Sequence, residues 1–325
     1  MSILRVVSVS GGKDSTALYC WAIDQWGRDG FKAVFADTGH EHPVTYNYLR
    51  NLPDMAGGPE ITWVRADFSE KLKNKGIEPS GNPFLDMMLW KGRAPSTTAQ
   101  FCTENTKLAP MAAWLETVRE DRGDGEVIQY TGIRAGESAK RALMPPREFV
   151  DYFDCYTERP LLRWNEEQVF DYLKSKGVPP NPLYEHGSAR VGCYPCIHSR
   201  KSELANMPDW AWDKLQEWES RLGGNWFLPG IIPLSPEIAR RKSEIMTERD
   251  AMVCDEEKGS SGKLKSELDR PRYDELTAEL LGLIIPKIKD VREWCRTARG
   301  GRQFDLFGED AKDIPTCMST WGICE

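Results

Sequence analysis

The sequence predicts an α/β protein with an open, mostly parallel, twisted sheet flanked by helices, followed by a helical C-terminal region. Apolar, β-branched runs at residues 3–9, 32–36 and 61–66 are typical of buried parallel strands. Helical patterns separate these runs, and short connections of this kind predict right-handed βαβ units. A chain of 325 residues is long enough for about two domains. We expect an α/β domain over residues 1–205 and a helical region with a cysteine-bearing tail over residues 206–325.

A glycine-rich segment joins the first expected strand to the first expected helix, and it reads Ser10-Gly11-Gly12-Lys13-Asp14-Ser15. Paired glycines let the backbone approach a ligand closely. The free N–H groups and the dipole of the following helix favour an anion. Lys13 adds a positive charge, and Ser10 and Ser15 add hydroxyl donors. The segment therefore predicts a phosphate or pyrophosphate site, although its spacing is not that of a Walker loop. The alternative is a glycine turn without a ligand.

The second strand ends in a polar segment, Asp37-Thr38-Gly39-His40. Ligands of parallel sheets bind beyond the carboxyl ends of the strands, so one pocket can include both segments. Asp37 suits a magnesium ion or a ribose. The alternative for Asp37 is a helix N-cap.

A fourth strand, residues 126–130, leads into a glycine and a set of charges. Gly132 follows the strand end, and Arg134, Glu137 and Arg141 would share one helix face. Two arginines near a strand end suit a polyanion such as phosphate or sulfate. The alternative is a ladder of surface salt bridges.

The remaining segments carry weaker patterns. Residues 67–105 are polar and poorly periodic, which predicts a long irregular loop acting as a lid or left disordered. Asn165 is expected to cap a helix. Further helices are expected over residues 207–222, 235–254 and 271–299.

Two of the nine cysteines, Cys193 and Cys196, form a C-x-x-C pair on a Gly/Pro turn, a spacing found in zinc sites and iron–sulfur clusters. Cys102 opens a helix, where a thiolate is stabilised. Cys317 and Cys324 in the tail are further candidate ligands, and His198 and Cys254 are weaker ones. Iron–sulfur, zinc and unligated thiols all remain open. Packing is the interpretation for Cys20, Cys155 and Cys295.

Composition limits the class of protein. No apolar run approaches the roughly 20 residues of a membrane span, and the chain enters a strand at once, so we expect a cytoplasmic protein with no membrane partner. A formal net charge of −7 does not favour nucleic-acid binding by the whole surface. Local basic clusters at residues 240–242 and 258–265 are interpreted as solvated faces.

Six ordered motifs between residues 3 and 205 resemble one family. They are Ser10-Gly11-Gly12-Lys13-Asp14-Ser15, Asp37-Thr38-Gly39-His40, Thr131-Gly132-Ile133-Arg134 with Glu137-Ser138 and Arg141, Arg159-Pro160-Leu161-Leu162 with Trp164, Asn181-Pro182-Leu183-Tyr184, and Arg190-Val191-Gly192-Cys193. The chain is similar to the phosphoadenosine phosphosulfate (PAPS) reductase family of the PP-loop ATP-pyrophosphatase, or adenine nucleotide α-hydrolase, superfamily. That family includes PAPS and APS reductases, the small subunit of ATP sulfurylase and the DNA phosphorothioation ATPase.

The resemblance implies an enzyme that binds ATP or an adenylylsulfate with Mg²⁺ and cleaves or activates it, with pyrophosphate release. It implies coupling to sulfur transfer at a cysteine-ligated [4Fe-4S] cluster, with zinc as the alternative metal, and a sulfur donor protein as partner. The implied catalytic residues are Lys13, Asp14, Arg134 and Arg141. The implied nucleotide-binding residues are Ser10, Gly11, Gly12, Lys13, Asp14, Ser15, Asp37, Thr38, Gly39, His40, Gly132 and Glu137, and the metal ligands would come from Cys102, Cys193, Cys196, Cys317 and Cys324.

The chain also departs from the family pattern. It ends in Gly322-Ile323-Cys324-Glu325, whereas PAPS and APS reductases end in Glu-Cys-Gly-x-His. Sulfite release by an APS or PAPS reductase is therefore the second hypothesis, with Cys324 or Cys317 as nucleophile. A third hypothesis is a nucleotide-sensing or nucleic-acid-associated module, whose C-terminal region binds a protein or a nucleic acid.

Overall fold

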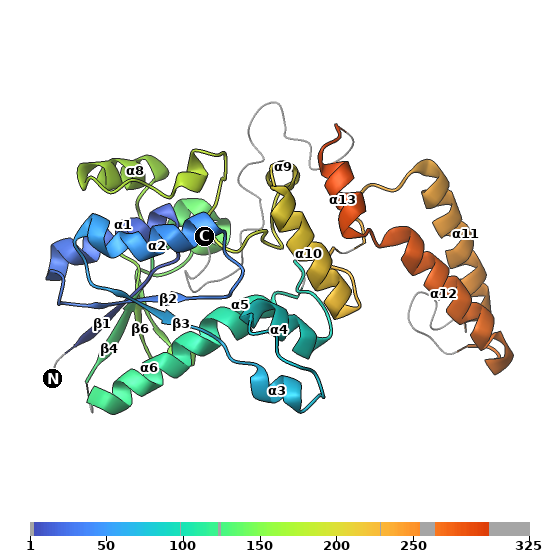
Figure 1. Cartoon of the computed structure of the whole chain (residues 1–325), viewed down its shortest axis with the longest axis horizontal. Coiled ribbons are helices and arrows are strands. Elements are labelled where there is room, and N and C mark those ends of the chain that lie inside the picture. The colour runs from blue at the N-terminus through green and yellow to red at the C-terminus, as the bar shows by residue number, and fades with distance from the viewer. Residues whose placement is uncertain (1–2, 98, 123–124, 228, 254–263, 299–325) are drawn as a thin grey trace. The chain divides into compact units, whose positions relative to one another are not determined.

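The computed structural model describes residues 3–97, 99–122, 125–227, 229–253 and 264–298 (Figure 1). One six-stranded sheet has the order β3-β2-β1-β4-β6-β5. The strands are β1 Leu4–Ser8, β2 Lys32–Ala36, β3 Ile61–Val64, β4 Val127–Tyr130, β5 Arg147–Val150 and β6 Cys155–Glu158. Every neighbouring pair is parallel except the edge pair β5–β6, which is antiparallel. The predicted fold class is confirmed.

Helices cover both faces of the sheet (Figure 1). Helices α1 Lys13–Trp26, α2 Pro43–Ala56 and α8 Glu166–Ser175 lie on one face, and α6 Ala109–Arg122 lies on the other. Asn165 caps α8 through a reciprocal capping box with Gln168, as its sequence predicts. The first three strands and their helices follow the predicted βαβ order.

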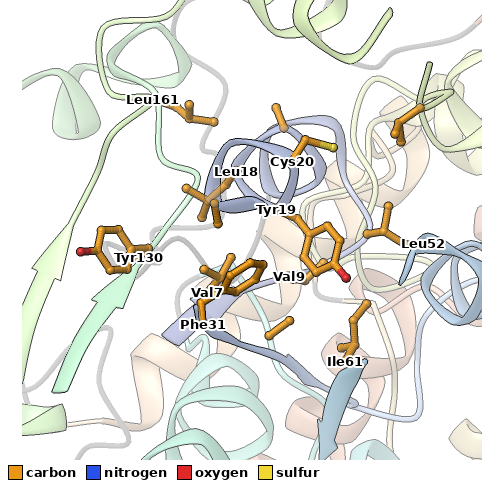
Figure 2. Packing of buried hydrophobic residues seen from close by; sticks show 14 of the residues in the cluster. Val7, Val9, Leu18, Tyr19, Cys20, Phe31, Leu52, Ile61, Tyr130 and Leu161 are labelled. Carbon is orange, nitrogen blue, oxygen red and sulfur yellow. The ribbon is translucent and has the colours of Figure 1, made fainter. Parts of the chain in front are cut away.

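The core beneath α1 and α2 is built from strand residues and the helices α1, α2 and α8 packed on them (Figure 2). Val7 and Val9 of the first strand segment meet Leu18 and Tyr19 of α1 in this cluster, and Leu52 of α2 joins them. A second cluster on the opposite face joins Val6 to Met111 and Leu115 of α6. Burial on both faces is why the central strands are nearly continuous apolar runs.

The segment predicted as a long irregular loop, residues 67–105, contains helices, so that prediction is wrong. They are α3 Ser69–Lys73, α4 Pro83–Lys91 and α5 Phe101–Thr103, and α5 continues through the π-helical turn η1 Glu104–Leu108 into α6. Asn82 caps α4 by accepting from the N–H groups of Phe84 and Leu85, and Pro83 occupies the first turn. Burial of the apolar side chains of α4 stabilises this short helix, which helix propensity alone would not hold together.

The polypeptide divides into two compact units, with the break between Glu203 and Leu204 inside α9 Lys201–Ala205. The second unit contains α10 Asp209–Leu222, α11 Pro236–Met252, α12 Arg270–Ile284 and α13 Ile288–Cys295. Helices α11 and α12 share a small core of Ile245, Leu276 and Leu280. The prediction of a single helix over residues 271–299 is wrong, because the structure has two helices there, α12 and α13. The backbone becomes extended at Ile285, immediately before Pro286.

Short helical turns complete the described elements: η2 Ala135–Glu137, α7 Ala139–Ala142, η3 Asp151–Phe153, η4 Pro182–Tyr184 and η6 Glu267–Asp269. No helix in the described part of the chain has both the length and the apolar character needed to cross a membrane.

The buried face of α1 makes a stability prediction. Leu18 is fully buried, so Leu18→Ala should lower the free energy of unfolding by about 2–5 kcal/mol through lost transfer energy and a residual cavity. Leu143 is 86% exposed, and Leu143→Ala should change it by less than about 0.5 kcal/mol. Urea denaturation of both variants measures the difference. Equal losses in the two variants would contradict the assigned core.

Candidate functional site

The glycine-rich turn after β1 is closed by its own serine and threonine hydroxyls. The Oγ of Ser15 accepts the N–H of Ser10 at 3.1 Å and donates to the carbonyl of Gly12 at 3.1 Å. Thr16 Oγ1 donates to the same carbonyl at 2.8 Å. The Oγ atoms of Ser10 and Ser15 lie 3.0 Å apart. These buried hydroxyls therefore fix the shape of the turn from inside.

A second segment supports the turn from outside. Asn181 Nδ2 donates to the carbonyl of Gly11 at 3.1 Å, and the N–H of Lys13 donates to the hydroxyl of Tyr184 at 3.0 Å. Gly11 has a φ of +82°, a backbone conformation that favours glycine. Asn181 and Tyr184 begin and end one of the six family motifs, but the sequence analysis assigned neither residue to the nucleotide site. Their role depends on backbone contacts, which residue type does not reveal.

Asp14 is fully buried and joins two cations. Its Oδ1 accepts from Arg134 Nε at 2.6 Å, and its Oδ2 lies 3.6 Å from Lys13 Nζ. Desolvation raises the pKa of the Asp14 carboxyl, and the charges of Lys13 and Arg134 oppose that shift. This contact fixes the plane of the Arg134 guanidinium. Asp14 therefore acts on the site through its neighbours.

The loop after β4 packs directly against the start of α1. A Cβ at Gly132 would lie 2.9 Å from the carbonyl carbon and oxygen of Asp14, so this position admits no side chain without a backbone shift. Two residues later Arg134 adopts an extended backbone and pairs with Asp14. Glycine is required at position 132 because the backbone of Asp14 lies too close to leave room for a side chain.

Glu137 joins the two predicted arginines. Its Oε2 accepts the N–H of Arg134 at 2.8 Å and pairs with Arg141. The three residues do not share one helix face, because Arg134 precedes η2 and Ser138 is extended between η2 and α7. The predicted shared helix face is therefore wrong, although the three charged residues do lie close together, as that prediction required. Arg134 and Arg141 are both buried, so the alternative of a surface ladder does not hold.

Asp37 is held by three protein groups. Its Oδ1 accepts from the N–H of Gly39 at 2.9 Å and from the Tyr46 hydroxyl at 2.8 Å, and its Oδ2 lies 3.0 Å from Arg65 Nε. It is not the cap of α2, because His42 takes that position through its Nδ1. The assignment of Asp37 to magnesium or ribose stays a prediction.

Glu41 was missed by the sequence reasoning and lies at the centre of a buried polar cluster. It accepts from Thr38 Oγ1 at 2.7 Å and from the Tyr46 hydroxyl at 2.9 Å. Burial raises the pKa of its carboxyl, and the nearby charge of Lys107 opposes the shift. The signal available in sequence was an acid directly after the Asp37–His40 motif.

The same cluster brings the C-x-x-C turn to the end of β2. Cys193 Sγ lies 3.9 Å from Glu41 Oε1, and the N–H of Tyr194 donates to the carbonyl of His40 at 2.6 Å. His40 Nε2 lies 3.0 Å from the carbonyl oxygen of Pro195. The two motifs, about 150 residues apart in sequence, therefore share one edge of the sheet.

Three of the five predicted metal ligands lie in the part of the chain that the structure describes. Cys102, Cys193 and Cys196 are half-buried, and Cys317 and Cys324 lie outside the described residues. Within the described ranges no group of three or more Cys, His, Asp and Glu side chains could hold a metal ion. The thiols that are described do not by themselves fit a cluster or a zinc ion. The [4Fe-4S] cluster and zinc stay predictions.

An open cavity of about 550 Å³ lies elsewhere, lined by Arg119, Phe149 and Tyr156 among others. It includes Val127 and Cys155, the first residues of β4 and β6. Ligands of parallel sheets bind at the carboxyl ends of the strands, so we assign the site to the glycine-rich turn and not to this cavity.

Fold and site together define a nucleotide-binding α/β protein with a PP-loop at the carboxyl edge of its sheet. A family model described as the phosphoadenosine phosphosulfate reductase domain matches residues 5–199. The chain belongs to this family, which confirms the resemblance drawn from its motifs.

Individual relatives differ in how much they cover. An uncharacterized 37.8 kDa protein of Escherichia phage 186 is 34% identical over 368 residues, covering 100% of this chain and 97% of that protein. The adenosine 5'-phosphosulfate reductase of Allochromatium vinosum is 30% identical over 145 residues, covering 44% of this chain and 54% of the reductase. A crystal structure of PAPS reductase from Candida auris, a phosphate complex, has a TM-score of 0.40 at 19% identity, covering 60% of this chain and 83% of that one.

The buried Asp14–Arg134 pair makes a second stability prediction. Asp14→Asn should lower the free energy of unfolding by about 3–5 kcal/mol, because it removes the acid that pairs with the buried guanidinium of Arg134. The surface variant Asp24→Asn, which breaks an exposed pair with Lys176, should cost at most about 1 kcal/mol. Urea denaturation compares them. The double variant Asp14→Asn/Arg134→Met should recover part of the loss, and failure of any recovery would contradict the pairing.

Thiol reactivity gives a third prediction. Burial raises the pKa of Cys20 to about 12 and that of Cys155 to about 11, so in the folded protein they should resist iodoacetamide at about pH 8. The half-buried Cys102, Cys193 and Cys196 should be labelled first. Peptide mass spectrometry over time measures the order, and labelling in denaturant is the control. Rapid labelling of Cys20 without denaturant would contradict the described burial.

Proposed function

We propose that the chain binds ATP or an adenylylsulfate at the carboxyl edge of the sheet and activates it for sulfur transfer. The observation that carries this proposal is the convergence of two cations, Lys13 and Arg134, on the start of α1, with a third cation linked to them. Lys13 lies in the helix, Arg134 is held there by Asp14, and Arg141 is linked through Glu137. Family membership and relatives named adenosine 5'-phosphosulfate reductase support an adenine nucleotide as substrate.

Binding would use the backbone and Lys13 together. The first turn of α1 offers N–H groups and a dipole that favours negative charge. The Tyr184 hydroxyl and the Asn181 amide hold the backbone of that turn in shape. Phosphate or sulfate oxygens would lie against this turn, with the Lys13 ammonium group beside them. The adenosine would lie toward the segment from Asp37 to His40.

The reaction would be adenylation. A nucleophile of the acceptor attacks the α-phosphorus of ATP, and the bond from that phosphorus to the bridging oxygen breaks. Pyrophosphate leaves with the electron pair of that bond. Lys13 and Arg134 would stabilise the negative charge that develops on the leaving group, because contacts with Asp14, and for Lys13 also with Glu166, already hold them.

Release of sulfite from APS or PAPS is the second candidate. The relatives named as reductases favour it, and the match to the Allochromatium vinosum protein covers about half of that enzyme. Its proposed nucleophiles, Cys324 and Cys317, lie outside the described residues. Both candidates use the same anion site, so they differ in products and not in the roles proposed for Lys13 and Arg134.

A binding experiment tests the shared site. ATP, APS and PAPS should each be compared with adenosine for the rise in melting temperature that they give the full chain, since a ligand of the folded state stabilises it. At least one of the three should stabilise the protein more than adenosine does. Lys13→Ala and Arg134→Met should remove that difference. Arg147→Met, a half-exposed arginine at the β5 edge, is the matched control. Equal responses of wild type and Lys13→Ala would overturn the site.

A product experiment separates the candidates. AMP and pyrophosphate released from ATP support activation, and sulfite released from APS or PAPS supports reduction. In either reaction Arg134→Met should lower the rate by about 10²–10³-fold, as expected for a group that stabilises developing charge. A nucleotide that binds but gives neither set of products, with or without thiol reductant and sulfide, would leave a sensing module as the better description.

A further inference from the structure

Four cations gather around two aromatic rings in the segment that joins β3 to α6. The Nζ atoms of Lys71 and Lys91 lie 4.5 Å and 4.2 Å from the centroid of the Trp90 ring. Lys75 Nζ donates to the carbonyl of Trp90. Arg93 lies over the Phe101 ring, 5.3 Å from its centroid. We name this set, Lys71, Lys75, Lys91 and Arg93 with Trp90 and Phe101, the basic aromatic patch.

The patch is assembled by the fold, not by a run of like residues. Its members come from α3, the turn after it, the end of α4 with the turn that follows, and the start of α5, and α3 packs against α4 (Figure 1). All four cations are exposed, and both rings are half-buried. A lysine-rich helix face alone would carry no such pair of rings at its centre.

The charges of the patch are not neutralised locally. Among the described residues, none of its four cations forms an ion pair with a carboxylate, whereas Lys176, Arg241 and Arg272 each do. Nearby acids do not cancel them: Asp86 is buried and accepts from Ser80 and Gly81, while Glu70 and Glu78 are exposed without such pairs among the described residues. Exposed positive charge concentrated in a chain of net charge −7 suits a polyanion.

We propose that the basic aromatic patch binds a single strand of nucleic acid. Its cations would contact successive phosphates, and Trp90 and Phe101 would stack on unpaired bases, in exchange for the ammonium groups that now cover them. The patch combines cations with aromatic rings. An acidic protein partner would need only the cations, whereas a nucleic acid uses both. A duplex hides the faces of its bases, so the rings favour an unpaired strand. This inference does not depend on the proposed function.

The test is fluorescence anisotropy of a labelled, mixed-sequence single-stranded oligonucleotide with the full chain across a salt series. Four phosphate contacts predict that log K falls with log salt at a slope of about −3. Lys91→Gln/Arg93→Gln should reduce the size of that slope by about 1.4 and weaken binding. Arg240→Gln/Lys289→Gln, which removes two exposed cations outside the patch, should change neither.

The aromatic component has its own readout. Trp90→Leu should weaken binding at fixed salt by about tenfold, and Trp90→Phe should retain most of it, because a ring remains to stack on a base. Melting temperatures check that the variants fold. If Trp90→Leu does not fold, the salt slope of the Lys91→Gln/Arg93→Gln variant still tests the inference.

Several outcomes would overturn the inference. They are no binding of the single strand at low salt, equal binding of a duplex of the same sequence with no effect of Trp90→Leu, and equal competition by polyglutamate of matched charge. The last result would assign the patch to an acidic protein partner. Loss of nucleotide binding in Lys13→Ala with unchanged binding of the oligonucleotide would separate the patch from the nucleotide site.

Discussion

The site depends on the close approach of the β4 loop to the first turn of α1. Gly132 admits the backbone of Asp14 where any side chain would collide with it, and that approach brings Arg134 within 2.6 Å of the Asp14 carboxylate. The acid then holds Lys13 and Arg134 beside one helix terminus. Two like charges would otherwise repel, so the buried carboxylate is what allows both to converge.

The parts of the fold that sequence predicted are those buried on both faces. The strands at 4–8, 32–36 and 61–64 are mostly apolar, with Arg5, Ser8, Lys32 and Thr62 as the polar exceptions. The hairpin of β5 and β6 was missed because its strands are only four residues long and expose Phe149 and Tyr156, so they lack the usual alternation of buried apolar and exposed polar residues. The short helices of residues 67–105 depend on caps and tertiary burial, which periodicity over a few residues does not reveal.

The site shows a similar division. The glycines of the PP-loop, Lys13 and Arg134 belong to motifs whose residue types indicate an anion site. The role of Glu41 is visible only from the folded structure, which surrounds it with Thr38 and Tyr46. Tyr46 lies within hydrogen-bond distance of both Asp37 and Glu41, at 2.8 Å and 2.9 Å. Burial raises the pKa of the Glu41 carboxyl, and the Tyr46 hydroxyl links this buried acid to Asp37 at the end of β2.

Net charge misleads when it is applied to a whole chain. Screening limits the reach of an exposed charge to about 10 Å at 0.1 M salt, so a partner at one surface responds to local charges and not to the sum. The total of −7 does not say where the charges lie: acids such as Glu275 and Glu279 are paired with arginines, and such pairs add nothing to the total. Lys71, Lys75, Lys91 and Arg93 form no such pair among the described residues, and they surround rings that a base can use. An acidic protein can therefore present a surface suited to a polyanion, because the fold concentrates unpaired cations in one place.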